Sequence, residues 1–565
     1  SNGKGHIDLN EIPIDDAKTY DMLQRGDTLG VFQLESSGMT ALVRRLRPDC
    51  FEDMIALVAL YRPGPLESGM VDTYVKCKHG EEKVHYLHPR LEPYMKDTYG
   101  VILYQEQVMQ SARELAGYTL GEADLLRRAM GKKKKEVMEK ERAKFVDGAV
   151  SNGVDAKQAG DIFDIIEKFA GYGFNKSHSA AYGLIAYWTA WLKANYGAEY
   201  LASYLSSLIG SKMEVLGQYI RAVRDAGYDV LPPDINESKE DFTVIGEVIR
   251  LGLSAIGKVG DAAVANIIEN RTKGGKFASL WDFLSRIDTR QVNRGVVENL
   301  IKSGAFDSLD PNRAKLLNAL PQLTELAARK AQNTNQASLF GDDEEDFFTP
   351  EMEEVPDFSE RQKLDLEKES MGLYISGHPF DQYEPSVEPY ITCPVGDLPN
   401  WRSHQPAVTA GLLTNFTEKF SKAGNPFGTA VIEDNRGTVD MLIFGKRWPL
   451  YKHTLQKGAL YFVKGQPKDD RGVSLMVDDI YSEEEYKEKL ERRAVITVES
   501  DGLGDKFYDG LFSILRAHPG RCELIIKLHG SAETSVSLIR NIKVDVTDEL
   551  RKELEDYSNG LVSCL

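Results

Sequence analysis

Apolar side chains recur at helical spacing through the first 230 residues. They stand three and four positions apart in five stretches that Gly-rich and Pro-rich turns separate. The stretches are 56–60, 103–116, 123–130, 159–169 and 181–196. The last of them is apolar over much of its circumference, which predicts a helix buried on most sides. This part of the chain is therefore predicted to be mainly α-helical.

The spacing changes from helical to alternating in the second half of the chain. Residues 249–309 still predict compact helices with glycine-containing turns, and 314–331 predict an amphipathic helix. Short alternating runs then predict five strands, a number that suits a small barrel. These runs are 407–413, 428–433, 439–444, 459–465 and 473–477. Residues 494–565 mix strands with helices and predict a separate α+β module.

Composition describes a multidomain globular protein. The chain has 565 residues, which at roughly 100 to 200 residues per domain suggests about three to five domains. No apolar run approaches the roughly 18 residues needed to cross a bilayer, so we predict no membrane segment. The first ten residues contain no secretory signal, and the chain is expected to be excised from a longer one.

Five cysteines without a CxxC pair predict reduced thiols in the cytoplasm. The residues Cys77, His79, His85 and His88 fit no paired-ligand spacing, so no metal site is predicted.

Charge is distributed unevenly along the chain. The net charge of −18 would by itself argue against a nucleic-acid binder. Residues 127–144, however, hold nine basic side chains against three acidic ones. Lysines this close repel one another, and a bound triphosphate or nucleic-acid backbone would relieve the repulsion, although a solvated basic face is the alternative. Residues 341–360 hold ten acids and no base, which predicts a flexible tether.

A second candidate site precedes the helix predicted at 181–196. The segment YGFNKSHSAAYG spans 172–183. A helix N-terminus offers unpaired N–H groups and a positive dipole, Lys176 and His178 add charge or donors, and Ser177 or Ser179 can cap. The pattern favours a polyphosphate site. A capped helix start with a satisfied histidine remains the alternative.

Five segments together carry a family resemblance. They are FQLES (32–36), ALYRPGP (59–65), YGVILYQEQVM (99–109), LLRRAMGKKKK (125–135) and the 172–183 segment. In this order they resemble the fingers of the bacterial DNA polymerase III alpha family. The resemblance implies the C-terminal part of a replicative, cytoplasmic DNA-directed DNA polymerase that works with the N-terminal part of the same polymerase. It also implies contacts with the incoming dNTP or the primer-template DNA from Arg62, Arg127, Arg128, Lys132, Lys133, Asn175, Lys176 and His178.

The catalytic carboxylates are not expected in this chain. The family's chemistry is two-metal phosphoryl transfer, in which palm aspartates hold Mg²⁺. Residues 1–16 resemble only the end of a palm, after its aspartates. Asp15 and Asp16 would point opposite ways on a strand, so a turn or a cap is predicted for them. We therefore expect no bound cofactor and no independent catalysis.

A glycine-containing turn at 256–260 interrupts the helical section LSAIGKVGDAAVANIIENR (253–271). It resembles the helix-hairpin-helix that holds DNA backbone without reading sequence. The residues expected to contact phosphate are Gly257, Lys258, Val259 and Gly260. An ordinary helical turn remains the alternative.

Three further segments resemble partner-binding parts of the family. QASLF (336–340) resembles a peptide for the beta sliding clamp, with Gln336, Ser338, Leu339 and Phe340 as anchors, although loop packing is the alternative. The strand-rich region resembles an OB-fold that binds single-stranded DNA. Its candidate residues are Phe416, Lys419, Phe420, Lys422, Phe427 and Phe444, although most aromatic residues of a small barrel belong to its core. The last module resembles the region that meets the clamp-loader tau subunit.

The expected architecture is multidomain, with mainly α-helical fingers and a helix-hairpin-helix region before an OB-fold barrel and a small α+β domain. The expected domains are the end of a palm (1–16), fingers (17–235), a hairpin and clamp-binding domain (236–335), the clamp peptide (336–340), an acidic linker and connector (341–384), the OB-fold (385–485) and a tau-interaction domain (486–565). A noncatalytic DNA-binding scaffold and a translesion paralogue of the same family are the alternative functions.

Overall fold

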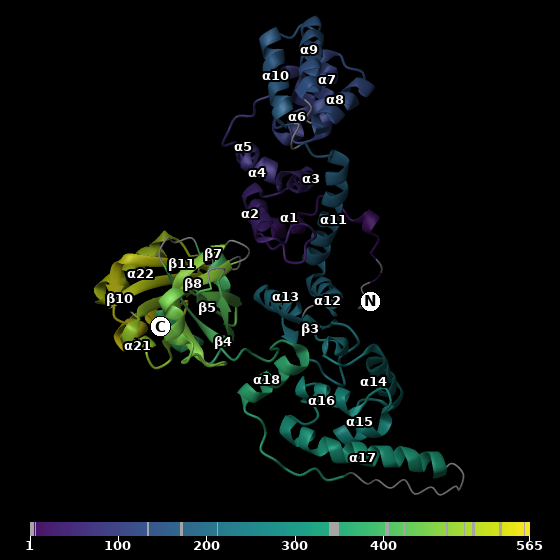
Figure 1. Ribbon diagram of the computed structural model, residues 1–565, viewed down its shortest axis with the longest axis vertical. Helices are drawn as coiled ribbons and strands as arrows, with labels where there is room; N and C mark the ends of the chain where they lie inside the picture. The colour runs from purple at the N-terminus through teal and green to yellow at the C-terminus, as the bar shows by residue number, and fades with distance from the viewer. Residues whose placement is uncertain are drawn as a thin grey trace. The chain divides into compact units, whose positions relative to one another are not determined.

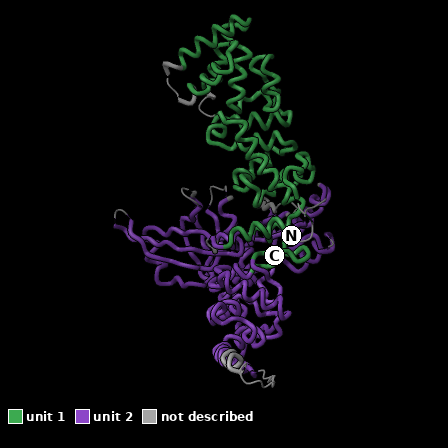
Figure 2. The backbone as a smooth tube through the Cα atoms, turned by 90° about the vertical axis from the view of Figure 1, so that its right-hand side faces the viewer, with its two compact units in different colours: residues 1–209, 222–230, 241–252 green, residues 210–221, 231–240, 253–565 purple. Residues whose placement is uncertain are grey.

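A computed structural model gives the fold of most of the chain. It describes residues 5, 7–132, 135–169, 173–211, 213–337, 350–401, 406–421, 424–469, 473–490, 492–499, 503–529, 534–558 and 560–564. The chain divides into two compact units (Figure 2). Unit 1 holds residues 1–209, 222–230 and 241–252, and unit 2 holds the rest. The helix α13 (Met213–Asp225) and the short strand β1 (Val230–Leu231) each contribute residues to both units.

Unit 1 is mainly helical. Its strands β2 (Thr243–Ile245) and β3 (Val248–Arg250) form one antiparallel pair. Three 3₁₀ turns, η1 (Leu9–Glu11), η2 (Pro89–Leu91) and η3 (Lys96–Thr98), stand between the helices. The helices are α1 (Ala17–Gln24), α2 (Ser37–Leu46), α3 (Phe51–Leu60), α4 (Pro63–Glu67), α5 (Met70–Lys78), α6 (Glu92–Met95), α7 (Gln105–Ala116), α8 (Leu120–Lys132), α9 (Lys135–Ser151), α10 (Ala156–Phe169), α11 (Lys176–Asn195) and α12 (Gly197–Ser207).

Two apolar cores hold unit 1 together. One lies among α1, α2, α3, α5 and α11, and the other among α7, α8, α9 and α10. The long helix α11 runs from the second group of helices past α3 (Figure 1). At Gly183 the two helices cross so closely that a Cβ atom would lie 3.2 Å from the Met54 carbonyl oxygen. A residue without a side chain therefore sets the distance between α11 and α3.

Unit 2 begins with helices that surround the glycine-containing turn. They are η4 (Leu253–Ala255), α14 (Asp261–Gly274), α15 (Leu280–Arg286), α16 (Arg294–Lys302), α17 (Arg313–Ala337) and α18 (Glu360–Met371). The first arm of the predicted hairpin is only the three-residue 3₁₀ turn η4. Gly252 and Gly257 lie on either side of it, and glycine weakens a helix, so a full helical arm does not form here.

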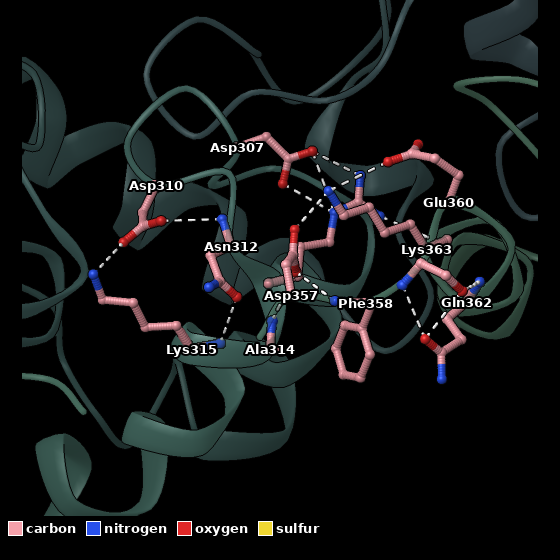
Figure 3. Close-up of polar contacts among 12 residues, drawn as sticks. Asp307, Asp310, Asn312, Ala314, Lys315, Asp357, Phe358, Glu360, Gln362 and Lys363 are labelled. Atoms are coloured by element: carbon pink, nitrogen blue, oxygen red, sulfur yellow. Dashed lines mark hydrogen bonds and ion pairs between the residues drawn. The ribbon is translucent and has the colours of Figure 1, made fainter. Parts of the chain in front are cut away.

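The described part of the acidic segment packs along α17. Asn312 Nδ2 donates to the Val355 carbonyl oxygen at 2.8 Å, and Lys363 Nζ lies 2.7 Å from Asp357. Figure 3 shows Lys363 beside Asp357, and Lys315 reaching Asp310. The prediction of a flexible tether is therefore wrong for 350–358, because Asn312 before α17, Lys315 in the first turn of α17 and Lys363 of α18 bind its carbonyl and acidic groups.

A buried carboxylate joins α18 to the barrel. Lys368 Nζ of α18 lies 2.8 Å from one oxygen of Glu433, and His378 Nε2 lies 3.5 Å from the other. Burial alone would raise the pKa of the Glu433 carboxyl. Contacts with His378 and Lys368 outweigh burial and hold this pKa at about 2. The carboxylate therefore stays charged at neutral pH and anchors the connector.

Five strands close into a barrel, as predicted. They are β4 (Ala407–Phe420), β5 (Pro426–Glu433), β6 (Thr438–Ile443), β7 (Leu460–Asp469) and β8 (Val473–Ser482). Their order is β4-β5-β6-β8-β7, in which β6 and β8 are parallel and the other pairs antiparallel. Short helices flank them: α19 (Glu384–Val387), η5 (Glu388–Tyr390), η6 (Val395–Asn400), η7 (Gly445–Arg447), α20 (Trp448–Tyr451) and α21 (Tyr486–Lys489).

A four-stranded sheet with two helices ends the chain. Its strands are β9 (Arg493–Glu499), β10 (Pro519–His529), β11 (Thr534–Val544) and β12 (Val562–Cys564), in the order β11-β10-β9-β12. The parallel pair β9–β10 requires a crossover, which α22 (Asp505–Ala517) supplies. α22 and α23 (Asp548–Ser558) pack their leucines on the sheet. The predicted fold class, helical fingers and hairpin followed by a barrel and an α+β module, is confirmed.

Among the described helices, none combines the length and apolar character needed to cross a membrane.

Candidate functional site

Two sequence motifs about 70 positions apart lie side by side in unit 1. The backbone N–H of Gln105 donates to Phe174 O at 2.9 Å, and Phe174 N–H donates to Leu103 O at 3.3 Å. Gln105 Nε2 donates to the Gly173 carbonyl at 2.8 Å. Glu106 accepts from Asn175 Nδ2 and from the backbone N–H of Lys176, both at 2.9 Å. Each residue from Gly173 to Lys176 therefore contacts the segment 103–106, and we call these paired segments the motif pair.

Backbone N–H groups in the first turn of α11 have acceptors within the chain. Asn175 is the N-cap, and its Oδ1 accepts from the N–H of His178 at 2.8 Å. The N–H of Lys176 is taken by Glu106. The prediction that Ser177 or Ser179 caps this helix is wrong, because Asn175 reaches the N–H groups first. An anion at this turn would meet side chains rather than a set of unpaired N–H groups.

Cationic side chains surround the motif pair. The exposed Arg62 guanidinium lies 4.5 Å from the centre of the Phe174 ring, and Lys176 Nζ lies 5.5 Å from the Tyr104 ring. Arg127 Nη1 donates to Gln105 Oε1 at 3.3 Å. These contacts hold three cationic side chains near one turn. Each contact is made to an aromatic ring or to an amide oxygen, so none of them neutralises the positive charge.

Asp124 orients the two arginines of α8. Arg127 and Arg128 both approach this carboxylate at 2.8 Å. A hydrogen bond from Arg127 lowers the pKa of the Asp124 carboxyl, which therefore stays ionised at neutral pH. One carboxylate shared by two guanidinium groups leaves a net positive surface on α8.

Aromatic rings continue the site along α11. The His178 ring contacts the Phe174 ring, with centroids 5.4 Å apart, and stacks on Tyr182 at 4.3 Å. Tyr182 in turn contacts Phe32 of the FQLES segment at 5.6 Å. Gln33, the next residue, has a φ of 64°, a conformation that non-glycine residues seldom adopt and that is often found at functional sites.

The structure thus brings together most of the predicted fingers residues. Arg62, Arg127, Asn175, Lys176 and His178 each touch the motif pair or belong to it, and Arg128 lies beside Arg127. α8 ends at Lys132, whose side chain is outside the described residues, as is all of Lys133. Sequence reasoning did not single out Gln105, Glu106, Phe174 or Tyr182. The polar triplet QEQ directly after the apolar run VILY was the available signal for the first two.

Two of the four predicted hairpin residues use their backbone N–H groups internally. Gly257 N–H donates to Ser370 O of α18 at 2.8 Å, and Val259 N–H donates to Ile256 O at 3.2 Å. Lys258 has a φ of 65°. Within the described part of the chain, the N–H groups of Lys258 and Gly260 have no acceptor. They are the donors this turn can offer to a phosphate.

The barrel residues predicted to bind single-stranded DNA lie on two different faces of the sheet. Lys419 of β4 pairs with Phe427 of β5, so both side chains lie on one face, and Phe427 stacks on Phe444 at 5.0 Å. Phe444 is 42% exposed. Phe420 is 67% exposed but follows Lys419 directly, so alternation turns it to the other face. Phe416 packs against the barrel core. Lys422 lies outside the described residues.

The predicted clamp peptide has its first two residues within α17. Gln336 belongs to the last turn of the helix, and its side chain is outside the described residues. Ser338, Leu339 and Phe340 are likewise outside them. The anchors of this peptide stay predictions.

One cluster of possible metal ligands among the described residues does not fit Mg²⁺. The groups of Asp49, Cys50 and Asp53 lie within 4.8 Å of one another. However, Lys78 Nζ lies 2.8 Å from Asp49 and 2.7 Å from Asp53, so an ammonium group takes the place of a cation. Asp16 accepts from the N–H of Thr19 at 3.0 Å and caps α1, as predicted.

Comparisons with known proteins show which family the chain resembles. Residues 1–153 match the model for the bacterial DNA polymerase III alpha subunit finger domain, and 227–316 match a helix-hairpin-helix motif model. The chain is 43% identical over 532 residues to DNA polymerase III subunit alpha of Escherichia coli O157:H7, covering 92% of this chain and 46% of the relative. The relative from Pasteurella multocida is 41% identical over 576 residues, covering 98% and 49%. The relative from Aquifex aeolicus is 39% identical over 562 residues, covering 97% and 46%.

The chain spans about half the length of the curated relatives it matches, and the matched part is their C-terminal half. The two family models and these identities confirm the resemblance that the motifs indicated. The chain therefore belongs to the family of bacterial DNA polymerase III alpha subunits.

Proposed function

We propose that this chain supplies the incoming-nucleotide and template contacts of a replicative DNA-directed DNA polymerase. The observation that carries the proposal is the motif pair, around which Arg62, Arg127 and Lys176 gather beside a row of aromatic rings. Cations recognise a triphosphate, and aromatic rings stack on unpaired bases. Membership in the polymerase family supports the same assignment.

In this proposal the residues of the chain bind and orient the substrate. Arg62, Arg127 and Lys176 draw the triphosphate to the motif pair, and Arg128 extends the positive surface along α8. His178, held between Phe174 and Tyr182, presents its ring beside the base or the phosphates. Phosphoryl transfer depends mainly on positioning and electrostatic stabilisation, which is what these groups supply.

Mg²⁺ belongs to the proposed reaction but is not assigned to these residues. In the intact enzyme the metal would neutralise the triphosphate and activate the primer hydroxyl. Since Lys78 already takes the cation position beside Asp49 and Asp53, we assign the metal ligands to the palm of the polymerase. We expect the chain to be inactive in synthesis when it is alone.

The remaining parts would hold DNA and replication partners. Lys258 and Gly260 offer backbone N–H groups to duplex DNA, and Lys419, Phe427 and Phe444 offer a barrel surface to single-stranded DNA. Residues 336–340 would bind the beta sliding clamp, and 486–565 would meet the clamp-loader tau subunit.

A noncatalytic DNA-binding scaffold and a translesion paralogue are the alternatives. A scaffold would keep the hairpin, the barrel surface and the clamp peptide, yet it has no need for the cations around the motif pair. A paralogue would share the fingers, and clamp-dependent processivity would distinguish the replicative enzyme from it.

Complementation tests the proposal. Primer extension on primed DNA, with Mg²⁺ and four dNTPs, is measured for the chain alone and after adding the N-terminal half of the E. coli relative, with and without clamp. We expect synthesis only from the complemented protein, stimulated by clamp and strongly reduced by Arg127→Ala or Lys176→Ala. A folded, complemented complex that binds primed DNA but extends nothing would favour the scaffold.

A further inference from the structure

Two adjacent side chains at the start of α7 connect Arg127 of α8 with the residues that begin α11. Gln105 Oε1 accepts from Arg127 of α8, while its Nε2 donates to Gly173 O before α11. Glu106 accepts from the Asn175 side chain and from Lys176 N–H. None of these side-chain hydrogen bonds is internal to α7, because each one reaches another segment of the chain.

We propose that Gln105 and Glu106 are positioning residues that fix the α8 arginines relative to the first turn of α11. The inference rests on the proposed function, because it assigns these residues to the nucleotide contacts named above. They need not touch the nucleotide themselves. They hold the groups that do.

The hydrogen-bonding pattern accounts for both residue types. Position 106 receives two donors, an amide NH₂ and a backbone N–H, and a carboxylate offers an acceptor oxygen to each. A glutamine there would satisfy one donor and oppose the other with its own NH₂. Position 105 faces one donor, the Arg127 guanidinium, and one acceptor, the Gly173 carbonyl. A glutamine amide matches this pair, whereas a glutamate would place charge against the carbonyl.

The placement of Glu106 adds an electrostatic argument. It stands in the first turn of α7, where the helix dipole favours a negative charge, and it reaches the first turn of α11, where the same holds. One carboxylate therefore bridges two helix N-termini. Without it the Lys176 N–H and the Asn175 amide lose their shared acceptor. The turn that carries Lys176 and His178 is then held to the start of α7 through Gly173 and Phe174, the two residues that precede it.

Near-isosteric exchanges test the inference without opening a cavity. Gln105→Glu and Glu106→Gln are compared with Glu114→Gln, a matched control on the same helix. Its carboxylate accepts from the Tyr94 hydroxyl at 2.8 Å, the one hydrogen bond found for it among the described residues. KM for dATP and kcat are measured by primer extension with the complemented protein. Circular dichroism and thermal unfolding of each variant verify that the chain is folded.

We expect Glu106→Gln and Gln105→Glu each to raise KM for dATP about ten- to a hundredfold, the size of one or two lost bonds to a charged group. Primer-template affinity and kcat should change much less, and Glu114→Gln should match the unchanged protein. Glu106→Ala is expected to be worse than Glu106→Gln, because glutamine keeps one of the two bonds.

The outcomes separate the inference from the function on which it rests. If the unchanged complemented protein extends primers and the Glu106 and Gln105 variants keep its KM, positioning by these residues is overturned while the nucleotide site stands. If Glu106→Ala instead lowers KM, the carboxylate competes with the triphosphate and the inference is also overturned. If the unchanged complemented protein is folded and inactive, the proposed function fails and the inference fails with it.

Discussion

Exchanging the amide and the carboxylate between Asn175 and Glu106 should restore the motif pair that either single change breaks. In Asn175→Asp the cap on His178 N–H remains, but the donor to Glu106 is lost and two carboxylates face each other. The lost bond costs about 1.5 kcal/mol, and the repulsion at about 4 Å near water adds about 1 kcal/mol. The two terms add to about 2.5 kcal/mol, and screening by water at the exposed Asn175 reduces the expected cost to about 2 kcal/mol. Glu106→Gln costs about 1.5 kcal/mol, since its NH₂ meets the Asn175 NH₂.

The double variant, which combines Asn175→Asp with Glu106→Gln, pairs every group again. The introduced glutamine would donate its NH₂ to the introduced aspartate and accept from Lys176 N–H with its oxygen. The same aspartate would still cap α11. We therefore expect the double variant to lie within about 0.5 kcal/mol of the unchanged chain, which gives a coupling energy of about 3 kcal/mol.

Local amide hydrogen exchange is the suitable assay, because a chain of several domains does not unfold in one step. Exchange of peptides covering 173–180 and 103–107 is followed by mass spectrometry. Asn175→Asp should lower protection about thirtyfold and Glu106→Gln about tenfold, and the double variant should return to nearly full protection. If the two losses simply multiply in the double variant, the two side chains do not act as a pair and the reasoning is refuted.

Three further predictions follow from other parts of the chain. Gly257→Ala should lower the local stability of the 256–260 turn by about 1–3 kcal/mol, because its Cβ would lie 2.6 Å from Ser370 O. A Cβ at Gly260 meets nothing within 4 Å, so Gly260→Ala should cost less than about 1 kcal/mol, through the weaker N-cap of α14. Amide hydrogen exchange of peptides covering the turn compares the two variants. The depressed pKa of Glu433, about 2, means that its ionised form stabilises the fold above a pH of about 4.5 and that this stability is lost as pH falls toward 2. The difference in local stability of the barrel between the chain and its Glu433→Gln variant should therefore narrow over that range. Hydrogen exchange of peptides covering β4 and β5, corrected for the intrinsic pH dependence of exchange, measures it, and a constant difference would contradict the linkage. Phe444→Leu should weaken oligo(dT) binding about five- to tenfold in fluorescence anisotropy, with Phe420→Leu as the opposite-face control, and equal effects of both would remove the stacking surface.

Local patterns were sufficient for the barrel strands and for part of the helices, while α1, α2, α5, α12 and α13 were not singled out. The alternating runs from 407 to 477 predicted the five barrel strands, and the apolar spacing of 159–169 and 181–196 predicted α10 and α11. α9 was missed because its charged residues are mixed among apolar ones without a clear stripe. β12 was missed because three residues carry no measurable period.

Contacts between distant segments were harder to predict than elements. The 172–183 segment indicated an anion site from residue types alone, which named Asn175, Lys176 and His178. The pairing of Glu106 with Lys176 joins residues 70 positions apart, and periodicity carries no information about which distant segments meet. The hairpin shows the same limit, because the use of Gly257 N–H by Ser370 depends on a helix that lies more than 100 residues later.

Photo-crosslinking tests the central claim most directly. The complemented protein on primed DNA is irradiated with an azido-labelled dATP and Mg²⁺, and crosslinked peptides are mapped by mass spectrometry with unlabelled dATP as competitor. We expect competed crosslinks in 173–182, in 124–132 or at Arg62, and we expect Lys176→Ala to abolish them together. Two results would contradict the nucleotide site proposed here. In one, unlabelled dATP competes only with crosslinks in other parts of the chain. In the other, primers are extended but unlabelled dATP removes no crosslink from this chain.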